Sequence, residues 1–293
     1  MARVAVVGVG AIGGALAALL ETAGGHEITL CTRRPLPALT VKTPQGAVNV
    51  KARNVIDPAQ AMPGDWVLVA TKAYDAEATA RWFPALCADG APVAIVQNGV
   101  EHRERFAPYI SQERLLSVVI DCPVERMPDG TVWVRGGALM KVKDSPLGQG
   151  FAALFAGSGT KLELLEDFKS AAWWKLCVNS VGALSALTSK PSGVLRGEAM
   201  RRVALQMVAE CAAVGRADGA RLHEGIGEEV LELYSKHPAD SVNSLLADRL
   251  AGRRMEWDAR NGAIVRIGEK HGIETPLNRM AATLLQAVET GAE

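Results

Sequence analysis

The 293-residue sequence has no net charge, because 32 lysines and arginines balance 32 aspartates and glutamates. Without a net positive field, we expect no binding to nucleic acid or to an anionic membrane. Cysteine and histidine are scarce, at five each, and neither forms a pair with the spacing of metal ligands. We therefore expect no disulfide framework, no zinc site and no metal cofactor. The dispersed cysteines fit core residues of a protein in the reducing cytoplasm.

A single long apolar run, residues 4–20, has some features of a signal peptide or a membrane span. Its first half is β-branched, its second half is rich in Ala and Leu, and a group of glycines separates them. This division predicts a strand, a turn and a helix instead of one continuous membrane helix. We therefore favour a structural segment over an exported one.

Short buried strands alternate with helices in the first half of the chain. The expected strands cover residues 3–7, 27–32, 65–71 and 91–97. Helices are expected over 11–23 and from about residues 76 and 100. Residues 41–55 contain a Pro-Gln-Gly turn and are expected to form a small hairpin or an extended loop. The alternation is typical of a doubly wound parallel sheet.

The pattern changes after residue 115. Residues 115–142 hold two or three strands separated by turns, which we expect to be antiparallel and to complete the edge of the sheet. The helices expected after residue 166 cover 168–188, 198–217, 224–235, 244–252, 256–271 and 277–290. The sequence therefore predicts an α/β domain over residues 1–166 and an all-α domain over residues 167–293.

The turn after the first strand has the sequence GVGAIG and opens the first helix. Gly8 permits a tight turn, Gly10 lets a pyrophosphate approach the backbone, and Gly13 lets the helix pack close to the strand. The helix start, including Ala11 and Ile12, offers N–H groups to the phosphates. In this position the motif predicts a Rossmann-type fold that binds a dinucleotide.

The end of the second strand indicates which dinucleotide binds. NAD sites usually place Asp or Glu there, but this chain has the sequence LCTRR over residues 30–34. An arginine can pair with the 2′-phosphate that distinguishes NADPH. We therefore predict NADPH, with Thr32 and Arg33 as the leading contacts. The alternative is a pair of solvated arginines at a strand end.

Two polar loops follow the next strands, TKAY at residues 71–74 and QNG at residues 97–99. Ligands of open α/β sheets bind at the carboxyl ends of strands. Lys72 could neutralise a phosphate or a substrate charge, and Asn98 could present its amide to the nicotinamide. A surface lysine and an ordinary Asn-Gly turn are equally good interpretations of the two residues alone.

The expected helix 168–188 carries Lys175 and Asn179 on one face, since they lie four residues apart. No other charged residue occurs from Lys175 to Leu187, which favours a buried stretch or one that lines a cleft. The alternative is a lysine that extends to solvent. A second polar group runs from Ser241 to Gly262, but spacing alone singles out none of its many charges, and Ser241 could cap a helix.

The ordered motifs GVGAIGG, TKAY, QNGV, WWKLCVN and S-x-x-x-D…R-x-x-E-x-D-x-x-N-G resemble those of the ketopantoate reductases (2-dehydropantoate 2-reductases). The resemblance covers nearly the whole chain. It implies a Rossmann domain joined to a helical domain, with the active site in the cleft between them. It also implies reduction of a small 2-oxo acid by NADPH, above all 2-dehydropantoate to pantoate in pantothenate biosynthesis.

The resemblance implies roles for individual residues. Lys175 matches the general acid, which as an ammonium would stabilise the developing oxyanion and donate the proton. Glu256 matches a second catalytic group that organises the substrate and the cofactor ribose. Lys72 matches a cofactor-side lysine, and Asn98 a residue near the nicotinamide and the substrate. Asn98 and Asn179 would orient the carbonyl and the carboxylate, and Ser244 would hold the distal end. The implied substrate contacts are Asn98, Lys175, Asn179 and Ser244.

Two positions depart from the family pattern. Ala183 replaces a second asparagine, and Ala247 replaces a glutamine before the aspartate. Both changes remove a group that could bond a substrate hydroxyl. A more apolar 2-oxo acid is therefore an alternative substrate, and a non-catalytic NADPH-binding sensor is an alternative function. The presence of both Lys175 and Glu256 weighs against the sensor. The apolar helical domain permits a homodimer without requiring one.

Overall fold

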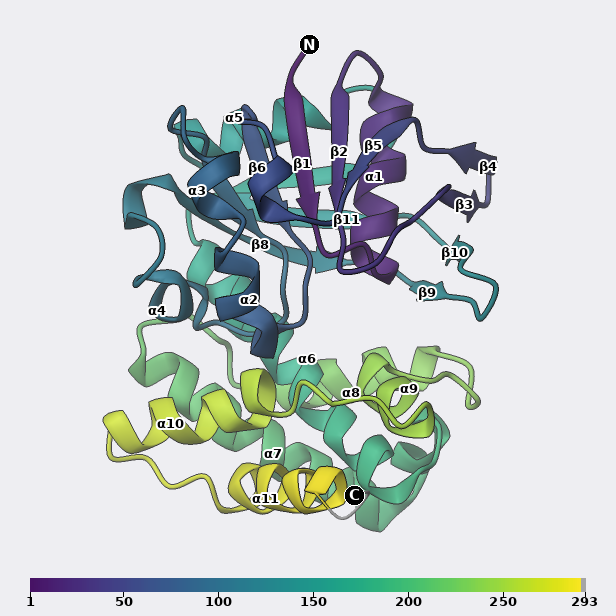
Figure 1. The fold of residues 1–293 in the computed structure, drawn as a ribbon. Coiled ribbons are helices and arrows are strands. Elements are labelled where there is room, and N and C mark those ends of the chain that lie inside the picture. The colour runs from purple at the N-terminus through teal and green to yellow at the C-terminus, as the bar shows by residue number, and fades with distance from the viewer. Residues whose placement is uncertain (291–293) are drawn as a thin grey trace. The chain divides into compact units, whose positions relative to one another are not determined.

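The computed structural model describes residues 1–290 and divides into two units (Figure 1). The first unit holds residues 1–97 and 102–168. The second unit holds the chain from residue 169 onward together with the short segment 98–101. Asn98 thus follows a strand of the first unit in sequence but belongs to the second by its packing.

An eight-stranded sheet forms the centre of the first unit, in the order β12-β11-β8-β7-β6-β1-β2-β5 (Figure 1). Its strands are β1 (Arg3–Val7), β2 (Glu27–Cys31), β5 (Ala52–Val55), β6 (Trp66–Val69), β7 (Val93–Ile95), β8 (Leu115–Asp121), β11 (Leu139–Lys143) and β12 (Lys161–Leu165). All neighbouring pairs are parallel except β8 and β11. The strands at the centre are apolar on both faces, as parallel strands covered by helices must be.

Helices cover both faces of this sheet. They are α1 (Ala11–Ala23), α2 (Ala76–Ala80), α3 (Phe83–Leu86), α4 (His102–Phe106) and α5 (Pro146–Leu154). Val4 and Val6 of β1 pack in one core with α1 and α5, whereas Ala5 and Val7 pack in a second core with α3 and α4. This alternation follows from the two-residue period of a strand. The predicted Rossmann-type class is confirmed.

A second, four-stranded sheet was not foreseen. It has the order β4-β3-β10-β9, from β3 (Thr40–Thr43), β4 (Gly46–Asn49), β9 (Val124–Arg126) and β10 (Val132–Val134). The expectation that residues 115–142 complete the edge of the main sheet is therefore wrong in part. β8 lies inside that sheet, parallel to β7, and only β11 pairs with it antiparallel. Val132 packs against α1 close to Gly14, a long-range contact that turn residues cannot reveal.

The second unit is helical. Its helices are α6 (Phe168–Thr188), α7 (Glu198–Ala217), α8 (Ile226–Lys236), α9 (Ser244–Leu250), α10 (Ala263–Lys270) and α11 (Pro276–Thr290). The single helix expected over residues 256–271 is wrong in detail. Glu256 precedes a π-helical turn (Asp258–Gly262), and α10 follows that turn. None of the described helices is long and apolar enough to cross a membrane.

Candidate active site

The glycine turn after β1 has the shape that a dinucleotide needs. Gly8 has a φ of +91°, and a Cβ there would lie 2.6 Å from the side chain of Thr71. A Cβ on Gly13 would lie 2.0 Å from the carbonyl oxygen of Gly8. A Cβ on Gly10, in contrast, would meet no atom within 4 Å. Gly8 and Gly13 therefore serve the fold, and Gly10 leaves open space in which a ligand would fit.

The start of α1 also fits an anion. Gly10 is the N-cap and makes no side-chain capping bond, and the first turn of the helix holds no acidic residue. The first intrahelical bond runs from the N–H of Gly14 to the carbonyl of Gly10, at 3.0 Å. The preceding N–H groups of Ala11, Ile12 and Gly13 therefore have no acceptor within the helix. These donors and the positive end of the helix dipole favour a pyrophosphate.

The predicted adenosine contacts lie at the end of β2. The Nδ2 of Asn54 donates to the Oγ1 of Thr32 at 2.7 Å, and this oxygen donates to the carbonyl of Arg34 at 2.7 Å. The side chain of Arg33 is 88% exposed and lies 3.8 Å from a carboxylate oxygen of Asp75. So long and exposed an ion pair is weak, so the guanidinium is available to a phosphate.

Gln97 connects the two polar loops, a role that the sequence analysis missed. Its Nε2 donates to the Oγ1 of Thr71 at 2.9 Å and to the carbonyl of Lys72 at 3.2 Å. The ring of His102 contacts the Gln97 carbonyl at 3.0 Å. Gln97 is buried, and its amide oxygen has no hydrogen-bond partner among the described residues. A polar residue at the end of an apolar strand was the available signal.

Arg126 was also missed. Its guanidinium donates to the carbonyl of Val9, inside the glycine turn. Arg126 belongs to β9 of the second sheet, so a residue far away in sequence adds a positive charge beside the expected phosphates. No local motif marks it.

In the helical unit, three predicted residues form one hydrogen-bonded line. The Nδ2 of Asn179 donates to the Oδ1 of Asn98 at 3.3 Å, and the Nδ2 of Asn98 donates to Glu256 at 3.3 Å. Glu256 is only 4% exposed. Lys175 lies one turn before Asn179 on α6 and is half-buried. The arrangement places a cation, two amides and a carboxylate on neighbouring positions.

The segment that carries Asn98 is held by an arginine. Arg266 of α10 donates to both carboxylate oxygens of Glu101, at 3.0 and 2.6 Å. The same guanidinium pairs with Asp258 of the π-helical turn. This two-pronged ion pair fixes the segment on the helical unit.

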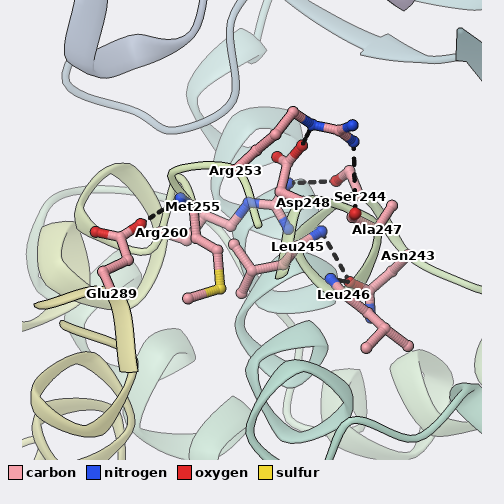
Figure 2. A network of polar contacts seen from close by, with 10 residues as sticks. All are labelled: Asn243, Ser244, Leu245, Leu246, Ala247, Asp248, Arg253, Met255, Arg260 and Glu289. Carbon is pink, nitrogen blue, oxygen red and sulfur yellow. Dashed lines mark hydrogen bonds and ion pairs between the residues drawn. The ribbon is translucent and has the colours of Figure 1, made fainter. Parts of the chain in front are cut away.

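Among the described residues, Ser244 makes no hydrogen bond to the Asn98 line and belongs to a second network (Figure 2). Its Oγ accepts a hydrogen bond from Nη2 of Arg260 at 2.7 Å. Asn243, not Ser241, caps α9, by accepting from the N–H groups of Leu245 and Leu246. Figure 2 also shows the ion pair of Asp248 with Arg253, at 2.9 Å.

Other motif positions are structural. Asn261 is fully buried and donates to the Ser180 carbonyl at 3.2 Å and to Asn278 at 2.9 Å, which joins the π-helical turn to α6 and α11. Ala183 is fully buried within the helical core. Ala247 bonds through its backbone alone: its N–H donates to the carbonyl of Asn243, and its carbonyl accepts from Arg253. The described residues hold no group of three or more His, Cys, Asp or Glu side chains placed to bind a metal ion.

A dinucleotide turn on a parallel sheet, joined in the same chain to a lysine, two amides and a buried carboxylate, defines a class of pyridine-nucleotide-dependent reductases. Sequence comparison agrees with this class. The chain matches the family model "Ketopantoate reductase PanE/ApbA" over residues 4–146 and the model of that family's C-terminal domain over residues 167–289. The chain belongs to the ketopantoate reductase family.

Individual relatives support the assignment. The 2-dehydropantoate 2-reductase of Caulobacter vibrioides is 47% identical over 287 residues, which cover 98% of this chain and 99% of the relative. The solved 2-dehydropantoate 2-reductase of Geobacter metallireducens GS-15 is similar with a TM-score of 0.91 at 26% identity, over 97% of this chain and 99% of that one. A D-mandelate dehydrogenase solved with NADH and anilino(oxo)acetate has a TM-score of 0.89 over 99% of each chain. At 20% identity, that likeness shows the fold alone.

Proposed function

We propose that this protein reduces 2-dehydropantoate to pantoate with NADPH as the hydride donor. The observation that carries the proposal is the line from Asn179 through Asn98 to Glu256, with Lys175 one helical turn away. A protein that only bound the cofactor would have no use for this acid and its neighbours. Its 47% identity to a 2-dehydropantoate 2-reductase supports the choice of substrate.

The cofactor is assigned to the first unit. The glycine turn and the N–H groups of Ala11 to Gly13 would hold the pyrophosphate, with Arg126 adding positive charge. Thr32 and Arg33 would hold the 2′-phosphate of NADPH, since no acidic side chain ends β2. Lys72 and Gln97 lie where the loops after β6 and β7 meet, and they would serve the cofactor's nicotinamide half. When bound, NADPH supplies the hydride.

The residues of the helical unit then handle the substrate. The Lys175 ammonium stabilises the negative charge that develops on the carbonyl oxygen and donates a proton to it. Asn98 and Asn179 orient the carbonyl group. Glu256 fixes the rotamer of Asn98 by accepting its amide hydrogen, and by its resemblance to the family's acidic residue it would also organise the cofactor ribose. Ser244 provides a hydroxyl to the substrate.

A second candidate substrate is a more apolar 2-oxo acid. Ala183 and Ala247 offer no side-chain hydrogen-bonding group to substrate hydroxyls. A site that bonds a hydroxyl discriminates strongly in its favour, so losing such partners weakens the preference for ketopantoate. The ratio of kcat/KM for ketopantoate to that for an alkyl 2-oxo acid without hydroxyls distinguishes the two candidates.

The test is steady-state turnover of Lys175→Ala. We expect kcat for ketopantoate to fall by about 10²- to 10⁴-fold, the range typical of a lost general acid, with little change in the Kd for NADPH. Lys169→Ala is the matched control, because Lys169 lies on the same helix and bonds Asp218 instead. Wild-type turnover in Lys175→Ala would refute the assigned role.

A further inference from the structure

Arg260 is a buried arginine with no acidic partner in the described part of the chain. The residue is only 3% exposed and lies in the π-helical turn between Glu256 and α10. Its Nη2 donates to Ser244, but its Nε has no hydrogen-bond acceptor among residues 1–290. Among residues 1–290 no carboxylate forms an ion pair with it. Such π-helical turns are frequent at functional sites.

The neighbours of Arg260 do not supply a counter-charge. Asp248, in the same network, is paired with Arg253 (Figure 2). Tyr234 interacts electrostatically with Arg260, but its hydroxyl donates to the Val178 carbonyl at 2.9 Å. Burial raises the pKa of Tyr234 to about 12 even though Arg260 acts to lower it, so the phenol is neutral at physiological pH. A buried cation without a paired anion is unfavourable in a protein that has no ligand to complete it.

The position of Ser244 gives an anion a route to this charge. Ser244 is exposed, whereas Arg260 behind it is buried. Because the serine oxygen accepts from Arg260, its own O–H is free to donate outward to a ligand. A hydroxyl polarised by a guanidinium in this way is a strong donor to a carboxylate.

We propose that Arg260 provides the positive charge that binds the C1 carboxylate of the 2-oxo acid, acting through the hydroxyl of Ser244. This inference rests on the proposed function, and it changes one of its details. From the family resemblance, Asn98 and Asn179 were expected to hold the carboxylate, and Ser244 the distal end of the substrate. The Asn98 amide already donates to the buried carboxylate of Glu256, so a second carboxylate there would compete for the same hydrogens.

Arg260 is thus a positioning residue that determines specificity for acids. It lies inside the R-x-x-E-x-D-x-x-N-G stretch but is not one of the residues that define this motif. In the sequence it is one of several charges between Asp248 and Gly262. Only its burial and its lack of an acidic partner distinguish it from the solvated arginines nearby.

The test compares ketopantoate with its primary amide, which keeps the carbonyl but has no negative charge. The kcat/KM of each compound is measured for wild type, Arg260→Gln and Arg260→Lys. We expect Arg260→Gln to lower kcat/KM for the acid by about 30-fold or more, mainly through KM, as for a lost partner of a buried charge pair. The value for the amide should change by less than about threefold. Arg260→Lys should recover part of the preference for the acid, because it restores the charge but not the planar fork.

Arg249→Gln is the matched control for a structural effect. Arg249 lies on α9, as Ser244 does, and bonds the carbonyls of Ala186 and Leu187, so its loss should affect acid and amide equally. Equal losses for acid and amide in Arg260→Gln would overturn the proposal. A second result would also overturn it. With dicarboxylic 2-oxo acids, Arg260→Gln would then reduce the preference for a distal carboxylate and leave the preference for the C1 carboxylate unchanged. If Arg260→Gln does not fold, as judged by circular dichroism, Ser244→Ala replaces it, with the same loss of acid preference expected.

Binding measurements separate this proposal from the proposed function. If the wild type turns over no 2-oxo acid, the proposed function fails. Calorimetric titration with pantoate and with its amide then tests Arg260 without turnover. A preference for pantoate in the wild type that is lost in Arg260→Gln upholds the carboxylate site, and an equal affinity for both compounds in the wild type overturns it.

Discussion

Two alanine substitutions in the glycine turn should separate cofactor binding from folding. A Cβ at Gly10 would meet open space in the protein, whereas a Cβ at Gly13 would lie 2.0 Å from the carbonyl oxygen of Gly8. The φ of Gly10 is −84°, which alanine tolerates. We therefore expect Gly10→Ala to weaken NADPH binding and Gly13→Ala to weaken the fold.

The magnitudes follow from these contacts. The methyl group of Gly10→Ala would occupy the space assigned to the pyrophosphate and would break one charge-assisted hydrogen bond, worth about 1.5–3 kcal/mol. The Kd for NADPH should then rise by about 10- to 100-fold. The stability of the free protein should change by less than about 0.5 kcal/mol. In Gly13→Ala the chain must move by more than about 1 Å to relieve the overlap, which costs about 1–3 kcal/mol. Each kcal/mol lowers Tm by about 2–4 °C in a domain of this size.

The assay is a pair of measurements on each variant. Thermal unfolding is followed without nucleotide, because a bound ligand would itself raise Tm. Binding of NADPH is followed by fluorescence titration. If Gly10→Ala lowers Tm as much as Gly13→Ala and leaves the Kd unchanged, the turn has a structural role alone, and the assignment of the pyrophosphate to α1 is refuted.

Three further outcomes follow from other contacts. Arg33→Ala should raise KM for NADPH by about tenfold or more and leave KM for NADH unchanged. Arg81→Ala, at another exposed arginine, is the control. Equal effects on the KM values of both cofactors would contradict the assignment of the 2′-phosphate to Arg33. Glu256→Gln should lower kcat for ketopantoate with the Kd for NADPH changed less, and an unaltered kcat would remove Glu256 from the site. Asp218→Asn should lower the unfolding free energy by about 1–2 kcal/mol at pH 7, because the carboxylate accepts from Trp173 at 3.1 Å and pairs with Lys169 at 3.2 Å. Burial acts to raise the pKa of Asp218, but Trp173 and Lys169 lower it to a net value below the usual 3.8. Its stabilising effect is therefore complete above that usual value and is lost as the pH falls through the lowered pKa, so the difference between Asp218→Asn and wild type should shrink in acid.

The sequence was most informative where local rules decide the structure. The strand, turn and helix of residues 3–23 follow from side-chain period and glycine placement, and the structure has them at those positions. The shift from strands to helices after residue 166 was equally readable, because it is a change of period. The pairing of β9 and β10 with the hairpin of residues 40–49 was not, since it depends on packing against α1.

The candidate site shows the same limit. Lys175 and Asn179 could be placed on one face from their spacing alone, and the resemblance pointed to Asn98 and Glu256. The hydrogen bonds that join these residues connect positions up to 158 residues apart, which no spacing rule reaches. Arg126 and Arg260 carried no signal in the sequence, because an arginine becomes informative only when its burial and its partners are known.

The measurement that tests the central claim most directly is spectrophotometric oxidation of NADPH by the wild-type protein with ketopantoate and with a panel of other 2-oxo acids. We predict turnover with 2-oxo acids, the highest kcat/KM for ketopantoate, and a loss of about 10²-fold or more in kcat in Lys175→Ala. NADPH binding without oxidation by any 2-oxo acid would contradict this prediction and would favour a sensor.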